Sequence, residues 1–336
     1  MKVVVLTTSY PRSFNEVAGT FVRSQVELLR AAGIDVAVVS PASFRHYGIA
    51  YGNGIVNNLR RRPWLLALLP LFLFAYVREA RRAARGADLV HAHWLPSALP
   101  ALVTRKPFVL QLWGSDVALA RRVSWLAKPL VRRARIVVCA SSALAEDAQR
   151  LGAKRVHVIP TGVELPEVVG EPEEPPHLLY VGRLSEEKGV RELAEAARGL
   201  PLVVVGDGPL RSLFPQATGF VPPSELGSYY ERAAIVVVPS RREGYGMVAR
   251  EAMAHGRPVV ATRIGGLVDA IEDGVTGVLV PPRDPDALRD PLIRLLGDAE
   301  LRRRLGAASR ERIRAHNSED AATKRTLALY RELVDG

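Results

Sequence analysis

Short apolar segments rich in β-branched residues recur along the chain, and segments with a helical period lie between them, such as 19–32 and 143–151. The apolar segments of the first half are residues 3–7, 35–40, 89–93, 108–112, 136–140 and 156–160. Those of the second half are residues 177–181, 202–205, 235–239, 259–262 and 277–280. Apolar strands that alternate with helices are typical of a parallel sheet covered by helices on both faces.

A polar segment at residues 166–176 separates the two series of predicted strands. It is rich in Glu, Pro and Gly and has no helical period, which is typical of a linker. A chain of 336 residues is long enough for two domains that each bury a core. We therefore predict an α/β protein with two doubly wound domains, residues 1–168 and 169–316, that face each other across a cleft.

The basic residues are unevenly spread along the chain. The net charge is +11, and residues 1–168 hold 23 Lys+Arg against 10 Asp+Glu, whereas residues 169–336 hold 23 against 25. This asymmetry indicates an anionic partner for the first domain. The basic stretches lack interleaved stacking aromatics and match no nucleic-acid module, so an anionic membrane surface or a phosphorylated acceptor fits better than nucleic acid. A solvated arginine-rich surface is the remaining alternative.

Residues 64–77 form an apolar segment interrupted only by Pro70 and the phenol of Tyr76. The arginines that flank it are Arg60, Arg61, Arg62, Arg78, Arg81 and Arg82. The segment is shorter than the roughly 20 residues that a membrane-spanning helix needs. Two alternatives remain, a helix pair packed on the first domain or an interfacial segment with its arginines at the lipid headgroups.

The start of the chain and its cysteine content both bear on location. The N-terminus enters a predicted strand at once and lacks the pattern of a signal peptide, and Cys139 is the only cysteine. A single cysteine offers no disulfide framework, so a reducing compartment is expected. We predict a cytoplasmic protein, with peripheral contact to the inner face of the membrane if the basic domain binds lipid.

The main chemical signal follows the apolar segment 235–239. Glu243 lies on the loop that leaves this predicted strand, and Glu251 lies eight residues later on a predicted helix, 247–255. Gly244 and Gly246 lie near Glu243 and allow backbone amides to approach a ligand closely. A helix N-terminus that follows a parallel strand favours an anion such as phosphate. We therefore expect the chemistry of this protein at residues 243–251.

The spacing of the two glutamates resembles the E-x7-E signature of retaining glycosyltransferases of family 4. Four further segments agree with that family in the right order, namely His91-Ala92-His93-Trp94, Leu112-Trp113-Gly114-Ser115-Asp116, Val181-Gly182-Arg183-Leu184-Ser185-Glu186-Glu187-Lys188-Gly189 and Val205-Gly206-Asp207-Gly208-Pro209. The resemblance covers nearly the whole chain. It implies the GT-B fold of two Rossmann-like domains, with the acceptor on the first and the nucleotide sugar on the second. It also implies that a C-terminal helix, within residues 317–336, crosses back onto the first domain.

The resemblance implies roles for particular side chains. Arg183 and Lys188 would hold the leaving diphosphate of the donor, and Glu251 would accept hydrogen bonds from the ribose hydroxyls. Glu243 would contact the transferred sugar, and His93 would lie over the same sugar. His91 is expected on the opposite face of its strand, in a structural role. Asp116 is not assigned as a base, because Trp113 stands where the family often has a histidine.

The same resemblance implies donor contacts from glycines and backbone amides. Gly19 is the single glycine in a loop where the family often has a glycine pair beneath the diphosphate. Gly206-Asp207-Gly208 follows a strand and would line the base pocket. The predicted donor-binding residues are Gly19, Asp207, Gly208, Gly244, Tyr245, Gly246, Met247, Val248 and Glu251.

The predicted function is transfer of a sugar, with retention, from a nucleotide-diphosphate donor to a hydroxyl group. UDP is the expected carrier because it is common in such enzymes, and the acceptor is a sugar, a lipid-linked sugar or a small molecule of glycan or glycolipid biosynthesis. No metal and no cofactor are expected, because protein cations replace the divalent ion. The alternatives are a GT-B nucleotide-sugar epimerase and an inactive membrane-surface binding protein. A nicotinamide oxidoreductase would need a third glycine after Gly208 at the fingerprint spacing, which is missing.

Overall fold

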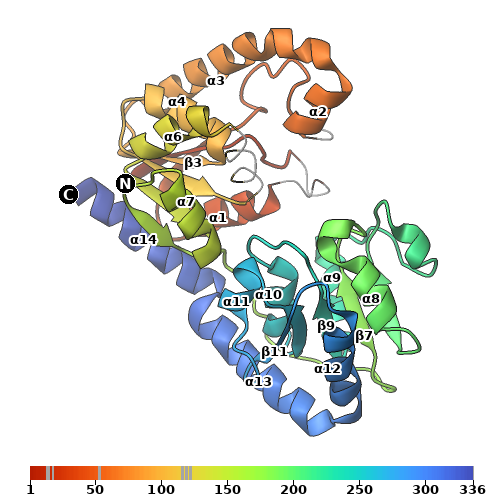
Figure 1. The fold of residues 1–336 in the computed structure, drawn as a ribbon. Coiled ribbons are helices and arrows are strands. Elements are labelled where there is room, and N and C mark those ends of the chain that lie inside the picture. The colour runs from red at the N-terminus through yellow and green to blue at the C-terminus, as the bar shows by residue number, and fades with distance from the viewer. Residues whose placement is uncertain are drawn as a thin grey trace. The chain divides into compact units, whose positions relative to one another are not determined.

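A computed structural model describes residues 1–12, 16, 19–51, 54–114, 117, 120 and 123–335, so Asp116 lies outside the described residues. The chain divides into two compact units (Figure 1). Unit 1 comprises Met1–Ile159 with Thr323–Gly336, and unit 2 comprises Pro160–Ala322. Each unit contains a parallel sheet, and the prediction of two doubly wound α/β domains is confirmed.

The sheet of unit 1 has six parallel strands in the order β2-β1-β3-β4-β5-β6. Its strands are β1 (Lys2–Leu6), β2 (Asp35–Val39), β3 (Leu89–His93), β4 (Phe108–Leu112), β5 (Ile136–Cys139) and β6 (Val156–Val158). Val3, Val4 and Val5 of β1 are all buried, which explains why the strands appear in the sequence as continuous apolar runs rather than alternating ones. The strand order reverses between β1 and β3, and ligands bind at such a switch point in open α/β sheets.

Helices cover both faces of the sheet of unit 1. The helices of unit 1 in the described part of the chain are α1 (Thr20–Ala31), α2 (Ile55–Arg61), α3 (Leu69–Ala83), α4 (Ala98–Val103), α6 (Ser124–Arg133), α7 (Ser142–Arg150) and α14 (Glu319–Asp335). One core cluster joins Val26 of α1, Val5 of β1 and Tyr330 of α14. The C-terminal helix therefore packs on the sheet of unit 1 from residue 323 onward, although its first turn belongs to unit 2 (Figure 1).

The sheet of unit 2 has five parallel strands in the order β11-β10-β9-β7-β8. Its strands are β7 (Leu178–Val181), β8 (Leu202–Val205), β9 (Ile235–Val238), β10 (Val259–Thr262) and β11 (Gly277–Val280). The order reverses between β7 and β9, which pair directly although more than fifty residues of sequence separate their ends. The loops that leave these two strands therefore meet at the carboxyl edge of the sheet.

Helices α8 (Val190–Ala196) and α12 (Pro285–Gly297) bury one face of this sheet, because Leu193 and Leu292 share a core cluster with Leu178 of β7. The opposite face is covered by α10 (Met247–Ala254), α11 (Gly265–Ala270) and α13 (Ala299–His316), as Met253 and Ile313 pack with Leu179. Helix α9 (Pro223–Arg232) contributes Tyr230 to the same cluster. Unit 2 is thus a doubly wound domain with a core on each side of its sheet.

The segment 166–176 does not link the two units. Arg310 Nη2 donates to the Pro166 carbonyl at 2.5 Å, Arg257 bonds the Gly170 carbonyl, and the Glu173 amide donates to the Arg232 carbonyl at 2.9 Å. These bonds attach the segment to unit 2, so the prediction of a linker here is wrong. The chain passes between the units at Ile159 and again inside α14, upstream of the predicted boundary at residue 168 and downstream of the one at 316.

The apolar segment predicted at residues 64–77 is longer in the structure. A 3₁₀ helix, Pro63–Leu68, runs directly into α3. By length and composition alone, Pro63–Ala83 could cross a membrane, and 22% of its most apolar 18 residues is buried inside the protein. One side of the segment packs inward through Leu65, Phe72 and Tyr76. The segment is therefore longer than the sequence analysis expected, and the expectation that it is too short to span a bilayer is wrong by length.

Candidate active site

Lys188 lies on the loop that leaves β7, at the end of a 3₁₀ turn formed by Glu186–Lys188. Gly189 follows it with a φ of +67°, and a Cβ at this position would lie 1.8 Å from the Pro239 carbonyl oxygen. No side chain fits in that space. The glycine therefore lets the loop after β7 lie in direct backbone contact with the loop after β9.

The predicted residues Lys188 and Glu243 are brought together by this contact. Lys188 Nζ lies 2.6 Å from Glu243 Oε2, and the Ser240 hydroxyl donates to the same oxygen at 3.3 Å. The side chains of Lys188 and Glu243 are 30% and 16% exposed. The ion pair is thus formed at the switch point between β7 and β9, and both of its members remain accessible to a ligand.

Arg183 precedes Lys188 on the same loop and is exposed. Its main chain is held by the Tyr180 hydroxyl, which donates to the Arg183 carbonyl at 2.9 Å. No carboxylate of the described residues lies within ion-pair distance of its guanidinium. Arg183 therefore offers an exposed cation on the loop that carries Lys188.

The loop after β9 ends at Gly246, which caps α10 with a φ of +84°. This left-handed backbone conformation favours glycine, and a Cβ on Gly246 would also lie 2.8 Å from Leu267 Cδ2. The amides of the first turn, including those of Met247 and Val248, have no acceptor within the helix. They combine with the helix dipole to favour an anion at this end of α10.

Tyr245 is buried, and its side chain points into unit 2. Its hydroxyl donates to the Thr161 carbonyl at 2.5 Å, and its ring lies under the Arg250 guanidinium at 3.8 Å. Arg250 also bonds the carbonyl groups of Tyr245 and Gly266, and burial lowers its pKa. The predicted donor contact of Tyr245 uses its backbone amide, so the inward direction of the side chain does not conflict with that prediction.

Glu251 lies on α10, one turn beyond the N-terminal amides. The buried Tyr230 hydroxyl donates to its Oε2 atom at 2.7 Å. Burial raises the pKa of the Glu251 carboxyl, and the hydrogen bond from Tyr230 opposes this rise in part. Glu251 is therefore an acceptor that loses its charge at a higher pH than an exposed glutamate does.

The loop after β8 lies beside the loop after β7. The Leu184 amide donates to the Asp207 carbonyl at 2.9 Å, and the Gly208 amide donates to Asp207 Oδ1 at 2.7 Å. The Asp207 carboxylate is exposed and lies 3.5 Å from Arg211. Unit 2 thus brings Arg183, Lys188, Asp207, Gly208 and the Glu243–Glu251 segment to one edge of its sheet.

His93 ends β3, at the switch point of unit 1. The ring is 1% exposed and stacks on Trp113 and His91, with centroid distances of 5.7 and 4.4 Å. Burial and the neighbouring His91 hold the pKa of His93 well below its usual value, so the imidazole is neutral at physiological pH. A contact with a sugar would require this ring to be uncovered when the ligand binds.

The expectation that His91 points to the opposite face of the strand is wrong. Side chains alternate along a strand, so residues two apart lie on the same face. His91 accordingly stacks on His93, and its Nδ1 atom lies 2.5 Å from the hydroxyl of Tyr330 on α14. Burial lowers the pKa of His91 to about 4. His91 is the structural histidine of the pair, but it supports His93 directly.

Gly19 precedes α1, which follows β1 in the chain, and it also lies in unit 1. Its φ is +84°, and a Cβ there would lie 2.4 Å from the Ser9 carbonyl oxygen. Packing alone therefore requires glycine at this position. The structure thus explains the residue without a ligand, and its contact with the diphosphate stays a prediction.

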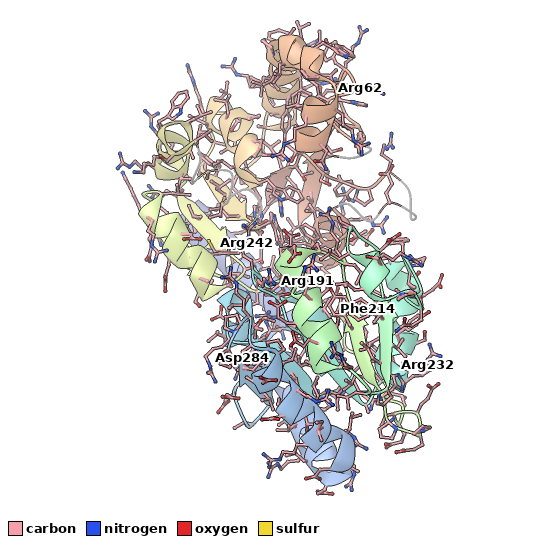
Figure 2. The ribbon with its side chains drawn as sticks, turned by 45° about the vertical axis from the view of Figure 1, so that its right-hand side comes forward. Arg62, Arg191, Phe214, Arg232, Arg242 and Asp284 are labelled. Atoms are coloured by element: carbon pink, nitrogen blue, oxygen red, sulfur yellow. The ribbon has the colours of Figure 1, made fainter. Side chains whose placement is uncertain are left out.

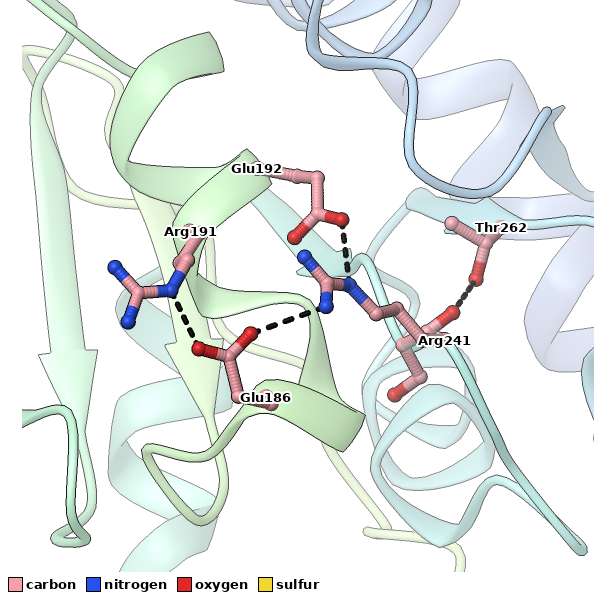
Figure 3. A network of polar contacts seen from close by, with 6 residues as sticks. Glu186, Arg191, Glu192, Arg241 and Thr262 are labelled. Carbon is pink, nitrogen blue, oxygen red and sulfur yellow. Dashed lines mark hydrogen bonds and ion pairs between the residues drawn. The ribbon is translucent and has the colours of Figure 1, made fainter.

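Three residues near the site were missed by the sequence reasoning, namely Tyr230, Arg241 and Glu192. Arg241 bonds both Glu192 and Glu186 across the two loops (Figure 3). Charged residues beside a motif look like a solvated surface in a single sequence. Arg241 lies two residues before Glu243, and this position beside the motif was the only sign in the sequence that any of the three belongs to the site.

Family models match both halves of the chain. "Glycosyltransferase Family 4" matches residues 18–167, and "Glycosyl transferases group 1" matches residues 164–312. TuaC of Bacillus subtilis (strain 168), a glycosyltransferase named for teichuronic acid biosynthesis, is 30% identical over 88% of this chain and 89% of its own length. The alpha-D-kanosaminyltransferase of Streptomyces kanamyceticus is 32% identical over 76% of this chain and 80% of its own.

Solved structures agree with these relatives. Sucrose-phosphate synthase from Thermosynechococcus elongatus superposes with a TM-score of 0.80 and 25% identity, over 99% of both chains. Anabaena Alr3699/HepE in complex with UDP superposes with a TM-score of 0.76 and 19% identity, over 99% of this chain and 100% of that one. The predicted GT-B fold is confirmed. The chain belongs to glycosyltransferase family 4 and is a nucleotide-sugar-dependent retaining glycosyltransferase.

Proposed function

We propose that this enzyme transfers a sugar from a UDP-sugar to a hydroxyl group, with Lys188 and Arg183 neutralising the diphosphate as it leaves. The observation that carries the proposal is the Lys188–Glu243 pair, 2.6 Å apart where β7 and β9 diverge. A donor placed there meets a cation for its phosphates and a carboxylate for its sugar. Negative charge grows on the departing phosphate, so cations and amides fixed around it lower the barrier most.

The remaining residues of the site have matching roles in the proposal. The first-turn amides of α10 face the diphosphate, and Glu251 accepts hydrogen bonds from the ribose hydroxyls. Asp207 and Gly208 line the base pocket. In unit 1, His93 is a neutral imidazole, which can both donate a hydrogen bond to a sugar hydroxyl and accept one from it.

UDP as the carrier is supported by the structural neighbours. Alr3699/HepE has been solved in complex with UDP and with UDP-glucose, on the fold that this chain shares. A panel of nucleotide sugars tests the proposal, with free nucleoside diphosphate as the readout. We expect release of UDP from a UDP-sugar, undiminished by EDTA. Conversion of the donor into an epimeric nucleotide sugar without free UDP would indicate the epimerase alternative, and loss of activity in EDTA that Mg²⁺ restores would overturn the role of the protein cations.

The raised pKa of Glu251 predicts a pH-dependent affinity for UDP. Only the ionised carboxylate accepts hydrogen bonds from both ribose hydroxyls, and burial raises the pKa of Glu251 above its usual value. Affinity should therefore fall as the pH drops through that raised pKa. Since the Tyr230 hydroxyl lowers the same pKa, Tyr230→Phe should move the midpoint to higher pH. Titration calorimetry with UDP from pH 5 to 8.5 measures the midpoint of this change in the unaltered protein and in Tyr230→Phe. An unshifted midpoint in Tyr230→Phe would remove Glu251 from the ribose site.

We propose that the acceptor is lipid-linked and is met at an anionic membrane on its cytoplasmic face. The outer side of the segment from Pro63 to the end of α3 exposes Trp64, Leu66, Leu71 and Phe74, of which Trp64 and Phe74 are 62% and 67% exposed. Because the other side is packed into unit 1, a contact that lies in the membrane interface suits this segment better than a span.

Basic residues surround this apolar side. Arg62 lies at the surface of unit 1, where α2 ends (Figure 2). Toward the end of α3, a hollow of about 430 Å³ is lined by Phe74, Val77, Arg78, Glu79, Arg81, Arg82 and Arg85. Four arginines in one hollow suit the phosphate of a lipid headgroup, and each basic residue near an anionic surface contributes about 1 kcal/mol to binding.

Vesicle flotation should show this contact directly. The protein should float with phosphatidylglycerol vesicles at low salt and not with phosphatidylcholine vesicles, because exposed charges are screened as salt rises. Changing Arg60, Arg61 and Arg62 to Glu, or Phe74 to Glu, should abolish flotation. The matched control reverses three exposed arginines of unit 2, Arg198, Arg303 and Arg304. If the control loses binding equally, or if the unaltered protein never floats, the basic side is only a solvated surface.

A further inference from the structure

The loops that carry Lys188 and Glu243 are joined by a network of charged side chains. Arg241 Nε lies 2.7 Å from Glu192 Oε1, and Arg241 Nη1 lies 3.0 Å from Glu186 Oε2 (Figure 3). Glu186 also accepts from Arg191 Nε at 2.5 Å. Arg241 is thus held from two sides, by the 3₁₀ turn that carries Lys188 and by the helix that follows it.

The main chain joins the same two loops. The amides of Arg241 and Arg242 both donate to the Glu187 carbonyl, at 2.9 and 3.2 Å. Behind them, the Thr262 hydroxyl donates to the Ser240 carbonyl at 2.5 Å, which connects the loop after β9 to β10 (Figure 3). Arg241 therefore stands at the point where the two loops are fixed to each other and to the sheet.

Burial separates this network from an ordinary surface ion pair. The Glu192 side chain is 8% exposed and that of Arg241 is 28% exposed. An exposed pair is screened by water and contributes little, whereas a carboxylate as buried as Glu192 must keep its cation. Arg191 and Glu186, by contrast, are both about half exposed and lie on the same side of the contact between the loops.

We propose that Arg241, anchored by Glu192, is a positioning residue that sets the distance between Lys188 and Glu243 for catalysis. This inference rests on the proposed role of Lys188 at the diphosphate. To bind the phosphates, Lys188 must exchange its contact with Glu243 for one with the donor, while the backbone of both loops stays in place. The Arg241 bonds involve neither Lys188 Nζ nor the Glu243 carboxylate, so they persist through that exchange.

The test is a double-mutant cycle of Arg241→Gln and Lys188→Ala, read as kcat and donor KM on the full chain. A small misplacement of a catalytic group costs up to about 10²-fold in rate, so Arg241→Gln should lower kcat about 10-fold with little change in donor KM. In the Lys188→Ala background the same change should lower kcat less than about 2-fold, because the group that it positions is gone. Glu192→Gln should behave like Arg241→Gln, and Arg241→Lys should restore part of the rate.

Arg191→Gln is the matched control, because it removes a bond to Glu186 that does not join the loops. It should leave kcat unchanged. If Arg241→Gln lowers kcat equally in both backgrounds, or raises donor KM as a direct contact would, the positioning role is overturned. If Arg241→Gln misfolds, Arg241→Lys and Glu192→Gln carry the same cycle. Unchanged kcat in Lys188→Ala alone would instead overturn the proposed function, so the two failures are distinguishable.

Discussion

Lys188→Ala is expected to lower kcat by about 10²-fold or more, with a much smaller effect on donor binding. Lys188 lies 2.6 Å from Glu243 in the structure, so its charge is partly neutralised until a donor arrives. The charge of the diphosphate grows as the glycosidic bond breaks, and the lysine is worth most at that moment. The measurement is turnover at saturating UDP-sugar, together with calorimetric affinity for UDP.

A conservative variant and a control variant accompany Lys188→Ala. Lys188→Arg keeps the charge on a bulkier group and should retain more activity than Lys188→Ala. Lys154→Ala removes an exposed lysine of unit 1 and should have no effect. Full turnover in Lys188→Ala would show that the cation does not act on the leaving group.

Gly189→Ala is expected to destabilise unit 2 by about 3 kcal/mol or more. The added Cβ would lie 1.8 Å from the Pro239 carbonyl oxygen, in a backbone conformation with φ of +67°. Both the clash and the left-handed conformation disfavour the native loop, and the loops after β7 and β9 would have to separate. Chemical denaturation followed by far-UV circular dichroism measures the loss.

Gly199→Ala is the control that separates the steric clash at Gly189 from the cost of a left-handed backbone. Gly199 also has a positive φ, +75°, but a Cβ there would meet no heavy atom within 4 Å. Gly199→Ala should therefore lower the free energy of unfolding only by the cost of the left-handed backbone conformation, about 1 kcal/mol. The chain's tryptophans, Trp64, Trp94, Trp113 and Trp125, all lie in unit 1, so their fluorescence follows unit 1 in the same samples. Equal stability of the two variants would contradict the close approach of the loops.

The sequence by itself determined the elements of both sheets and the positions of the motifs along the chain. The strands at 89–93, 108–112, 202–205, 259–262 and 277–280 were predicted with the bounds that the structure shows. This was achievable because parallel strands buried on both faces carry continuous apolar runs, and glycines and prolines end the helices between them. The motif segments then identified the family, because their residues and their order along the chain can be read without knowing the fold.

Other features were decided only by the tertiary structure. Strand order places β7 beside β9, and this brings Lys188 to Glu243 and Arg241 to Glu192 across about fifty residues of sequence. The inward direction of Tyr245 and the attachment of 166–176 to unit 2 likewise depend on partners far along the chain. The physical reason is that local patterns report whether a position is buried, whereas the partner that buries it is set by how strands and helices pack.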